Sequence, residues 1–302
     1  MNRIFLPLAV LLGTLCCEAQ GLDPILKRGI KLHDEGKFEE AIATYDSAIA
    51  ANPGSYLAYY EKSLSLMKSG KLQESIDLSD WALKKFPDGE ENASFYVNNG
   101  TCWDLLKNPQ KALEVYDEGI KKYPGTSLLY FNKAITLYNT GKLRETEAAL
   151  EKSIHYNPYH ASSHQVMAVL KSQSNRSYSL LAGLFFMVIE PTGKRAEGRL
   201  QLIEAAIGAN VEKKDDKNVT INLSMPDKKD KQPNDFSMME MVMSMSVALD
   251  HSDKNKNETR PQRMQRVLDT VFAVLSEQEK GSGFGWAFYV PFFADLKNKG
   301  HL

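Results

Sequence analysis

The sequence has few means of covalent stabilisation and no excess of either charge. Three cysteines occur in 302 residues, and Cys16 and Cys17 both lie in a short apolar run near the amino terminus. Only Cys102 lies elsewhere, so we expect no disulfide beyond that run. The 37 basic and 38 acidic residues nearly cancel, which gives no net field to attract nucleic acid or an anionic membrane. The fold must therefore depend on its apolar core.

The chain also lacks the usual sequence marks of an enzyme. The glycine-rich stretch 281–285 does not stand between a strand and a helix, so it is no phosphate-binding loop. His155, His160 and His164 have no cysteine or acidic partner to complete a zinc or copper site, and we interpret them as surface and capping residues. Cys102 has no nearby base and is interpreted as a small buried residue. We expect no catalytic residue, no cofactor and no metal.

Methionine is the one soft ligand that is concentrated in the sequence. The residues are Met238, Met239, Met241, Met243 and Met245. A copper site is one interpretation. Met238, Met241, Met245 and Leu249, however, recur on one helical stripe, which favours a core face or the lining of a groove.

The first residues predict export. Arg3 precedes an apolar run from Ile4 to Cys17, and Cys17-Glu18-Ala19 places small residues where a signal peptidase cleaves. We therefore expect residues 1–19 to be a signal peptide, the mature chain to begin at Gln20, and the protein to be periplasmic or secreted, with no integral membrane segment. A retained anchor or a lipid on Cys16 or Cys17 is the alternative, although the residues before Cys16 fit a lipobox poorly. The short signal favours a bacterial source.

Prolines recur at a nearly fixed spacing, which indicates an internal repeat. Pro53, Pro87, Pro124 and Pro158 are separated by 34, 37 and 34 residues, and each follows a run with helical periodicity. A three-residue insertion near Gly89 accounts for the longer interval. Small and large residues alternate at matching places in each unit, so the repeat extends through two helices.

Each unit has the same division of roles. Small residues that let the two helices approach are Gly29, Ser63, Gly100, Ala134, Ala41, Ser75 and Ala112; large residues that fill the space between units are Leu32, Leu66, Trp103, Leu137, Tyr45, Tyr116 and Leu150. Glycines 36, 70 and 141, each followed by lysine, end the first helix of a unit because glycine adopts a left-handed cap at little cost. The third unit has Asn108-Pro109 there, which predicts a helix stop by another route.

This pattern resembles the tetratricopeptide repeat at nearly every signature position. The resemblance implies an all-α fold, in which helix-turn-helix units stack into a right-handed superhelical solenoid with a helical carboxyl-terminal extension. A plain helical bundle is the alternative.

We divide the chain accordingly. The solenoid spans residues 22–192, with clear repeats at 22–55, 56–89, 93–126 and 127–160 and a degenerate fifth repeat at 161–192 that opens with His164. A capping helix (193–209), a polar linker (210–234) with one β-like stretch at 219–223, and a helical, aromatic-rich segment (235–302) follow. The aromatic residues after Gly283 need cover, so we expect them to pack on the solenoid or the preceding helices; an exposed binding patch is the alternative.

The resemblance also places a ligand groove along the first helices of the repeats. The positions that line it in the family are held here by Leu26, Ile30, His33, Leu57, Tyr60, Leu64, Met67, Val97, Thr101, Asp104, Leu128, Phe131, Ile135, Tyr138 and Asn139. Family members that clamp an acidic peptide terminus have Lys and Asn where Leu26 and Ile30 stand, so that clamp is absent. Partner binding is expected at Tyr60, Leu64, Met67, Val97, Phe131, Ile135, Tyr138 and Asn139, unless the chain's own tail or amino-terminal segment fills the groove.

The sequence thus predicts a non-catalytic protein–protein interaction scaffold of the cell envelope, which binds a peptide or helix in the groove. No nucleic-acid partner is expected, and the protein partner is not identified. The alternative is an accessory subunit of an envelope enzyme or transport assembly, with a small-ligand role in the carboxyl-terminal segment.

Overall fold

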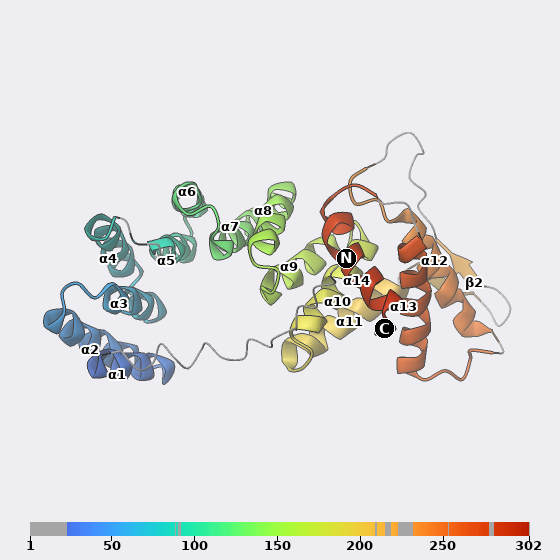
Figure 1. The fold of residues 1–302 in the computed structure, drawn as a ribbon, viewed down its shortest axis with the longest axis horizontal. Helices are drawn as coiled ribbons and strands as arrows, with labels where there is room; N and C mark the ends of the chain where they lie inside the picture. Colours follow the sequence, from blue (N-terminus) through green and yellow to red (C-terminus); the bar gives the residue numbers. More distant parts are fainter. Residues whose placement is uncertain are drawn as a thin grey trace, which may run out of the picture. The chain divides into compact units, whose positions relative to one another are not determined.

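The computed structural model describes residues 23–87, 89, 92–208, 210–214, 219–222, 232–252, 254–277 and 281–301. The signal peptide expected at residues 1–19 and much of the expected linker lie outside these residues. Over the described residues the chain forms α-helices in consecutive pairs, with a single two-stranded hairpin and no sheet core (Figure 1). The all-α prediction is therefore confirmed.

Ten helices form the repeat region. They are α1 (Pro24–Asp34), α2 (Phe38–Ala51), α3 (Tyr56–Lys68), α4 (Leu72–Lys85), α5 (Ala93–Leu105), α6 (Pro109–Lys122), α7 (Ser127–Asn139), α8 (Leu143–Tyr156), α9 (Ala161–Lys171) and α10 (Arg176–Ile189). The elements that follow are α11 (Lys194–Gly208), β1 (Val211–Lys213), β2 (Val219–Ile221), α12 (Ser237–Ala248), the 3-10 helix η3 (Leu249–His251), α13 (Arg260–Glu277) and α14 (Phe284–Asn298).

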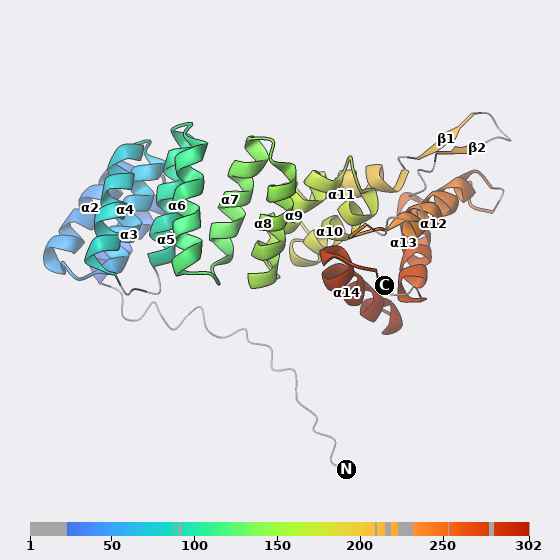
Figure 2. The same ribbon diagram turned by 90° about the horizontal axis from the view of Figure 1, so that it is seen from above.

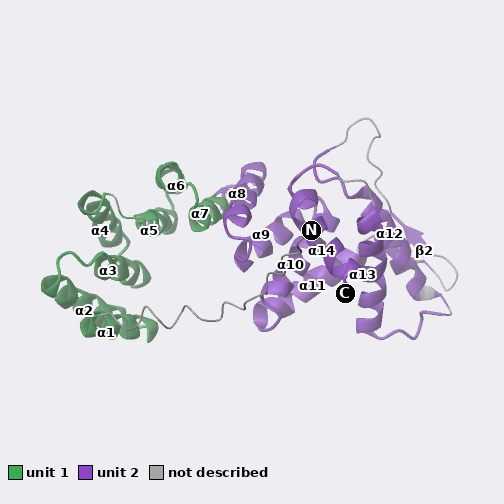
Figure 3. Cartoon of the chain, viewed as in Figure 1, with its two compact units in different colours: residues 1–136 green, residues 137–302 purple. Residues whose placement is uncertain are grey.

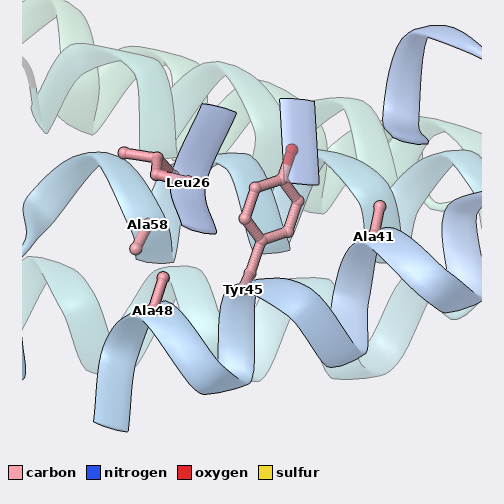
Figure 4. Packing of buried hydrophobic residues seen from close by; sticks show 5 residues of the cluster. All are labelled: Leu26, Ala41, Tyr45, Ala48 and Ala58. Carbon is pink, nitrogen blue, oxygen red and sulfur yellow. The ribbon is translucent and has the colours of Figure 1, made fainter. Parts of the chain in front are cut away.

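The chain divides into two compact units, residues 1–136 and 137–302, so the boundary falls within α7 (Figure 3). In the first unit, a large ring from the second helix of a repeat packs on a glycine of the first helix. A Cβ added at Gly29 would lie 2.4 Å from Cε1 of Tyr45, and one added at Gly100 would lie 2.4 Å from Cε1 of Tyr116. Figure 4 shows Tyr45 with Ala41 and Ala48 on the same helix, beside Leu26 and Ala58. The small residue on the first helix of these repeats therefore leaves room for the tyrosine ring of the second helix.

The turn inside the third repeat differs from the expectation. Lys107 adopts the left-handed conformation (φ 62°) at the place where Gly36, Gly70 and Gly141 do so in the other repeats (φ 75–86°). The next amide, Asn108 N–H, donates to the carbonyl of Trp103 at 2.9 Å, as Lys37 N–H does to that of Leu32. Asn108-Pro109 therefore starts α6, and the first helix ends by the same cap as elsewhere.

In the second unit, aromatic residues of α14 are covered by earlier helices. Tyr289 is fully buried, and its ring centroid lies 5.9 Å from that of Tyr178 and 5.7 Å from that of Phe185. Trp286 stacks on Phe236 with centroids 5.0 Å apart. Helix α14 contacts both α10 and α13 (Figure 2). The prediction that the aromatic tail packs on the solenoid and on the preceding helices is confirmed, within this unit.

The β-like stretch pairs with a second short strand, whereas we expected a solvated linker that contains a single edge strand. Residues 219–221 of β2 bond antiparallel to residues 211–213 of β1, with Thr220 opposite Glu212. Valine and isoleucine favour this extended pairing, which gives the all-α fold one small hairpin.

Candidate protein-binding face

The first helices of the repeats form one layer in the first unit. Helix α3 contacts both α1 and α5, so the faces of these helices are continuous. Most residues that the sequence assigns to the groove lie on this layer. Some of their side chains are available to a partner, and others are used within the fold.

Polar side chains link neighbouring first helices. His33 Nδ1 lies 2.7 Å from Ser65 Oγ, and the Asn98 side-chain amide donates to Ser63 Oγ at 3.0 Å. Thr136 Oγ1 donates to Asp104 Oδ2 at 2.7 Å. Because His33 and Asp104 are held by these bonds, the layer is less uniformly apolar than the sequence indicated.

The predicted partner-binding residues on α3 and α5 differ in their surroundings. Tyr60, Leu64 and Met67 share one face of α3, at spacings of four and three residues, and all three are half-buried; we call them the α3 strip. Val97 is half-buried and packs against the core of the third repeat. Tyr60 packs in the same way against the buried cluster of Phe95, and the two ring centroids lie 6.1 Å apart. The structure thus brings the α3 strip together and directs part of Tyr60 and of Val97 inward.

The predicted residues on α7 belong to both units. Phe131 and Ile135 are half-buried in the first unit. Tyr138, with 38% of its area exposed, and the exposed Asn139 belong to the second unit. The α3 strip lies wholly within one unit and is therefore the best-defined part of the face.

One residue of the expected groove is a core residue instead. Leu26 is buried against Tyr45 and Ala48, where it fills the space beside the small alanines of the cluster. The expectation that Leu26 faces a ligand is therefore wrong. Leu57 and Ile30 are half-buried at the edge of the same cluster, and their place in the groove stays a prediction.

Glu61 is a candidate that sequence reasoning missed. Glu61 is half-buried next to Tyr60 on α3, and its carboxylate has no hydrogen bond or ion pair among the described residues. Burial, followed by the nearby charge of Asp34, raises the pKa of Glu61 above its ordinary value. A single charge between the apolar positions Tyr60 and Leu64 is the signal that could have identified it. A cation brought to this point would stabilise the carboxylate.

The histidines do not form a metal site. His155 is exposed and His160 caps α9, as expected, but His164 is completely buried. Its Nε2 lies 2.8 Å from the carbonyl oxygen of Pro158 and its Nδ1 lies 2.8 Å from the Tyr289 hydroxyl. The interpretation of His164 as a surface residue is wrong. Among the described residues no cluster of three histidine, cysteine or acidic side chains is arranged to hold a metal.

His164 works as a neutral polar link. A carbonyl only accepts, so Nε2 carries the proton, and Nδ1 accepts from the Tyr289 hydroxyl. Burial lowers the pKa of His164 to about 4, against the smaller opposing effect of the Pro158 carbonyl. Tyr59 and Tyr130 hold the same place in their repeats and donate to Pro53 and Pro124. Histidine keeps this bond and adds a second one to α14.

Cys102 is buried, and burial raises the pKa of its thiol. This agrees with its interpretation as a small core residue and leaves little reactive thiolate.

The methionine stripe of α12 faces outward. Met238, Met245 and Leu249 expose 47%, 54% and 52% of their area, while Met239 and Met243 are fully buried. Of the two interpretations of the Met238 stripe, the core face is wrong, because the opposite face of α12 supplies the buried residues. The lining of a groove stays a prediction.

A crevice lies between α11 and α13 in the second unit, with a volume of about 510 Å³. Apolar side chains of Leu200, Pro261, Met264 and Leu268 line it, and the ion pair of Glu204 with Arg260 stands beside them.

None of the helices that the structure describes is both long and apolar enough to span a bilayer.

Comparison with known families decides what the repeats are. The family model of the tetratricopeptide repeat matches residues 26–90 and, in an overlapping match, residues 60–127. Residues 26–127 therefore contain tetratricopeptide repeats. The matched region covers α1 to α6, and the helices α7 to α10 follow it in the chain. Tetratricopeptide repeats are units whose stacked surfaces mediate protein–protein interaction.

The relatives share the repeats over part of their length. The chain is 25% identical over 130 residues to tetratricopeptide repeat protein 6 of Homo sapiens. The aligned residues cover 43% of this chain and 24% of that protein. It is 29% identical over 98 residues to Hsp70-Hsp90 organizing protein 3 of Arabidopsis thaliana, covering 32% and 17%. The chain thus spans about a quarter or less of these relatives.

A solved structure shows the same fold. A thermophilic tetratricopeptide-repeat protein of Thermus thermophilus superposes with a TM-score of 0.50 at 16% identity, covering 60% of this chain and 96% of that one.

Proposed function

We propose that this chain is a non-catalytic interaction scaffold of the cell envelope, and that it binds a segment of another protein on the first-helix layer. The observation that carries the proposal is the half-buried α3 strip beside the unpaired carboxylate of Glu61. Large apolar and aromatic side chains that stay partly exposed often dominate interface energy.

The face selects a partner by its chemistry. An amphipathic helix with apolar residues at four- and three-residue spacing would match Tyr60, Leu64 and Met67. A lysine or arginine on that segment would pair with the Glu61 carboxylate, whose charged form is destabilised by burial and then by Asp34. We therefore infer an apolar segment with a basic residue, which differs from the acidic peptide terminus bound by a lysine clamp.

Site-specific photo-cross-linking tests this proposal. A benzophenone side chain is placed at Leu64, and for the control at the exposed Ala50 of α2. In envelope extract we expect one protein to be captured from position 64 and not from position 50. With that protein purified, Tyr60→Ala should weaken binding by about 2 kcal/mol, roughly 30-fold. Equal capture from both positions would rule out the α3 strip.

The Glu61 carboxylate has a test of its own. Glu61→Gln keeps the shape of the side chain and removes its charge. Binding of the same partner should weaken and lose part of its salt dependence. An unchanged affinity at low and high salt would contradict a basic residue in the partner.

Placement in the envelope rests on residues 1–19 of the sequence. Mass spectrometry of the exported protein should give a chain that begins at Gln20. A diacylglyceryl group on Cys16 or Cys17 would contradict release by a signal peptidase.

The α11–α13 crevice supports a second candidate, an accessory subunit that holds a small apolar ligand. Its volume lies in the range of ligand pockets. Native mass spectrometry of the purified protein tests it, since a bound small molecule lost on Leu268→Glu would support this role.

A further inference from the structure

Helix α12 carries methionines on both faces, and the two sets have different surroundings. Met239 and Met243 are fully buried and, with Val247, form the packed side of the helix. Met238 and Met245 are about half exposed, and Met241 is half-buried between them. We call these last three residues the methionine face.

Packing does not account for the methionine face. Met238 and Met245 expose about half of their area and Met241 is half-buried, whereas other residues form the packed side of α12. An exposed helix position favours a charged or polar residue. What methionine alone adds there is an accessible, polarisable sulfur.

We propose that Met238, Met241 and Met245 bind a soft monovalent metal ion of the Cu(I) class through their three thioethers. Thioether sulfur selects Cu(I) over harder ions such as Mg²⁺ or Ca²⁺, which prefer oxygen. Binding requires no proton release, because thioethers carry no proton. The site is independent of the protein-binding face proposed above.

The helix spaces these ligands suitably. Residues three and seven positions apart fall within about 60° of one another around an α-helix, and about 10 Å separates the first from the last along its axis. Met241 lies between the outer two. Methionine has three rotatable side-chain bonds, so the outer sulfurs can turn toward the middle one.

Cys102 and the buried methionines of α12 are poorly placed to compete. Cys102 is buried in the first unit, and Met239 and Met243 are fully buried on the opposite side of α12. Binding on the surface of α12 should therefore involve the methionine face and leave the other two methionines of the helix unaffected.

Methyl NMR of the full chain with the substitutions C16S and C17S, labelled at methionine methyl carbons and titrated with Ag(I) as a redox-inert probe, tests the proposal. The two substitutions remove thiols that would bind Ag(I) before the thioethers do. The expected result is a shift of three methyl signals, saturating at one equivalent. Single Met→Leu variants assign these signals to Met238, Met241 and Met245. The triple variant M238L/M241L/M245L should lose the binding event, whereas M239L/M243L should retain it.

Leucine keeps the apolar surface and helix propensity, so the triple variant should fold as the wild type does, which circular dichroism checks. Shifts confined to other methionines, or silver binding retained by the triple variant, would overturn the proposal. A protein that binds Ag(I) but does not withdraw Cu(I) from a chromophoric chelator would also overturn the proposal, because the site would then not be of the Cu(I) class.

Discussion

The link between His164 and Tyr289 offers the sharpest test of how the carboxyl-terminal helix is held. Tyr289→Phe removes one hydroxyl and keeps the ring that packs near Tyr178 and Phe185. His164 Nδ1 then loses its donor in a fully buried site. A buried polar atom without a partner costs about 1–3 kcal/mol.

Hydrogen exchange of α14 amides at pH 7 measures this loss locally. If α14 opens without global unfolding, its slowest amides should exchange about 5- to 150-fold faster in the variant, which is the same free energy expressed as a ratio. The two compact units make this local measure preferable to one global unfolding free energy. Tyr159→Phe, at a side chain that is 76% exposed, is the matched control and should change nothing.

The pH dependence gives a second reading of the same link. Folding lowers the pKa of His164 from 6.5 to about 4, so the unfolded state binds a proton more readily. The stability contributed by neutral His164 is present above pH 6.5 and is lost as pH falls toward 4. Unchanged α14 exchange in Tyr289→Phe, together with no acid-dependent opening of α14, would refute the reasoning.

The remaining predictions concern packing, titration and exposure. Ala112→Leu in the third repeat should lower stability by about 1–3 kcal/mol through overpacking, and an unchanged denaturation midpoint would show that the repeat register is wrong. Burial, with the neighbouring Glu147, raises the pKa of Glu151 from 4.5 to about 7. The stability linked to its protonated form is present below pH 4.5 and is lost as pH rises through 7. In thermal unfolding, Glu151→Gln should therefore be more stable than the wild type at about pH 8 and little different from it at about pH 4. Dilute peroxide should oxidise Met238 and Met245 before Met243, and peptide mapping showing the reverse order would contradict the orientation of α12.

The repeat was predictable from the sequence because its constraints are local. A tyrosine that fits only over glycine, and a glycine that takes a left-handed turn, leave a periodic trace. Tyr45 over Gly29 is such a case. The same periodicity placed His164 at the position of Tyr59 and Tyr130, although its burial was not foreseen. That burial depends on α14, whose Tyr289 lies 125 residues away in sequence.

The candidate face was less predictable, because position in a repeat does not fix exposure. Leu26 occupies a ligand-facing position of the family yet fills the core of its own repeat. The interpretation of the α12 methionine stripe as core was wrong for another reason. Methionine occurs on both of its faces, so composition could not distinguish the buried side from the exposed one, and only tertiary packing decides between them.

Lys107 has a consequence for how the repeats tolerate substitution. Three of its counterparts are glycines with positive φ, and Lys107 adopts the same backbone shape. A left-handed conformation costs a residue with a Cβ about 1–2 kcal/mol. Glycine in that place would instead increase the entropy of the unfolded chain, a change worth about 0.4–1 kcal/mol. The two effects oppose each other, so the net penalty is small. The cap position that is glycine in three repeats can therefore hold another residue in a fourth, while the helix still ends at the equivalent residue.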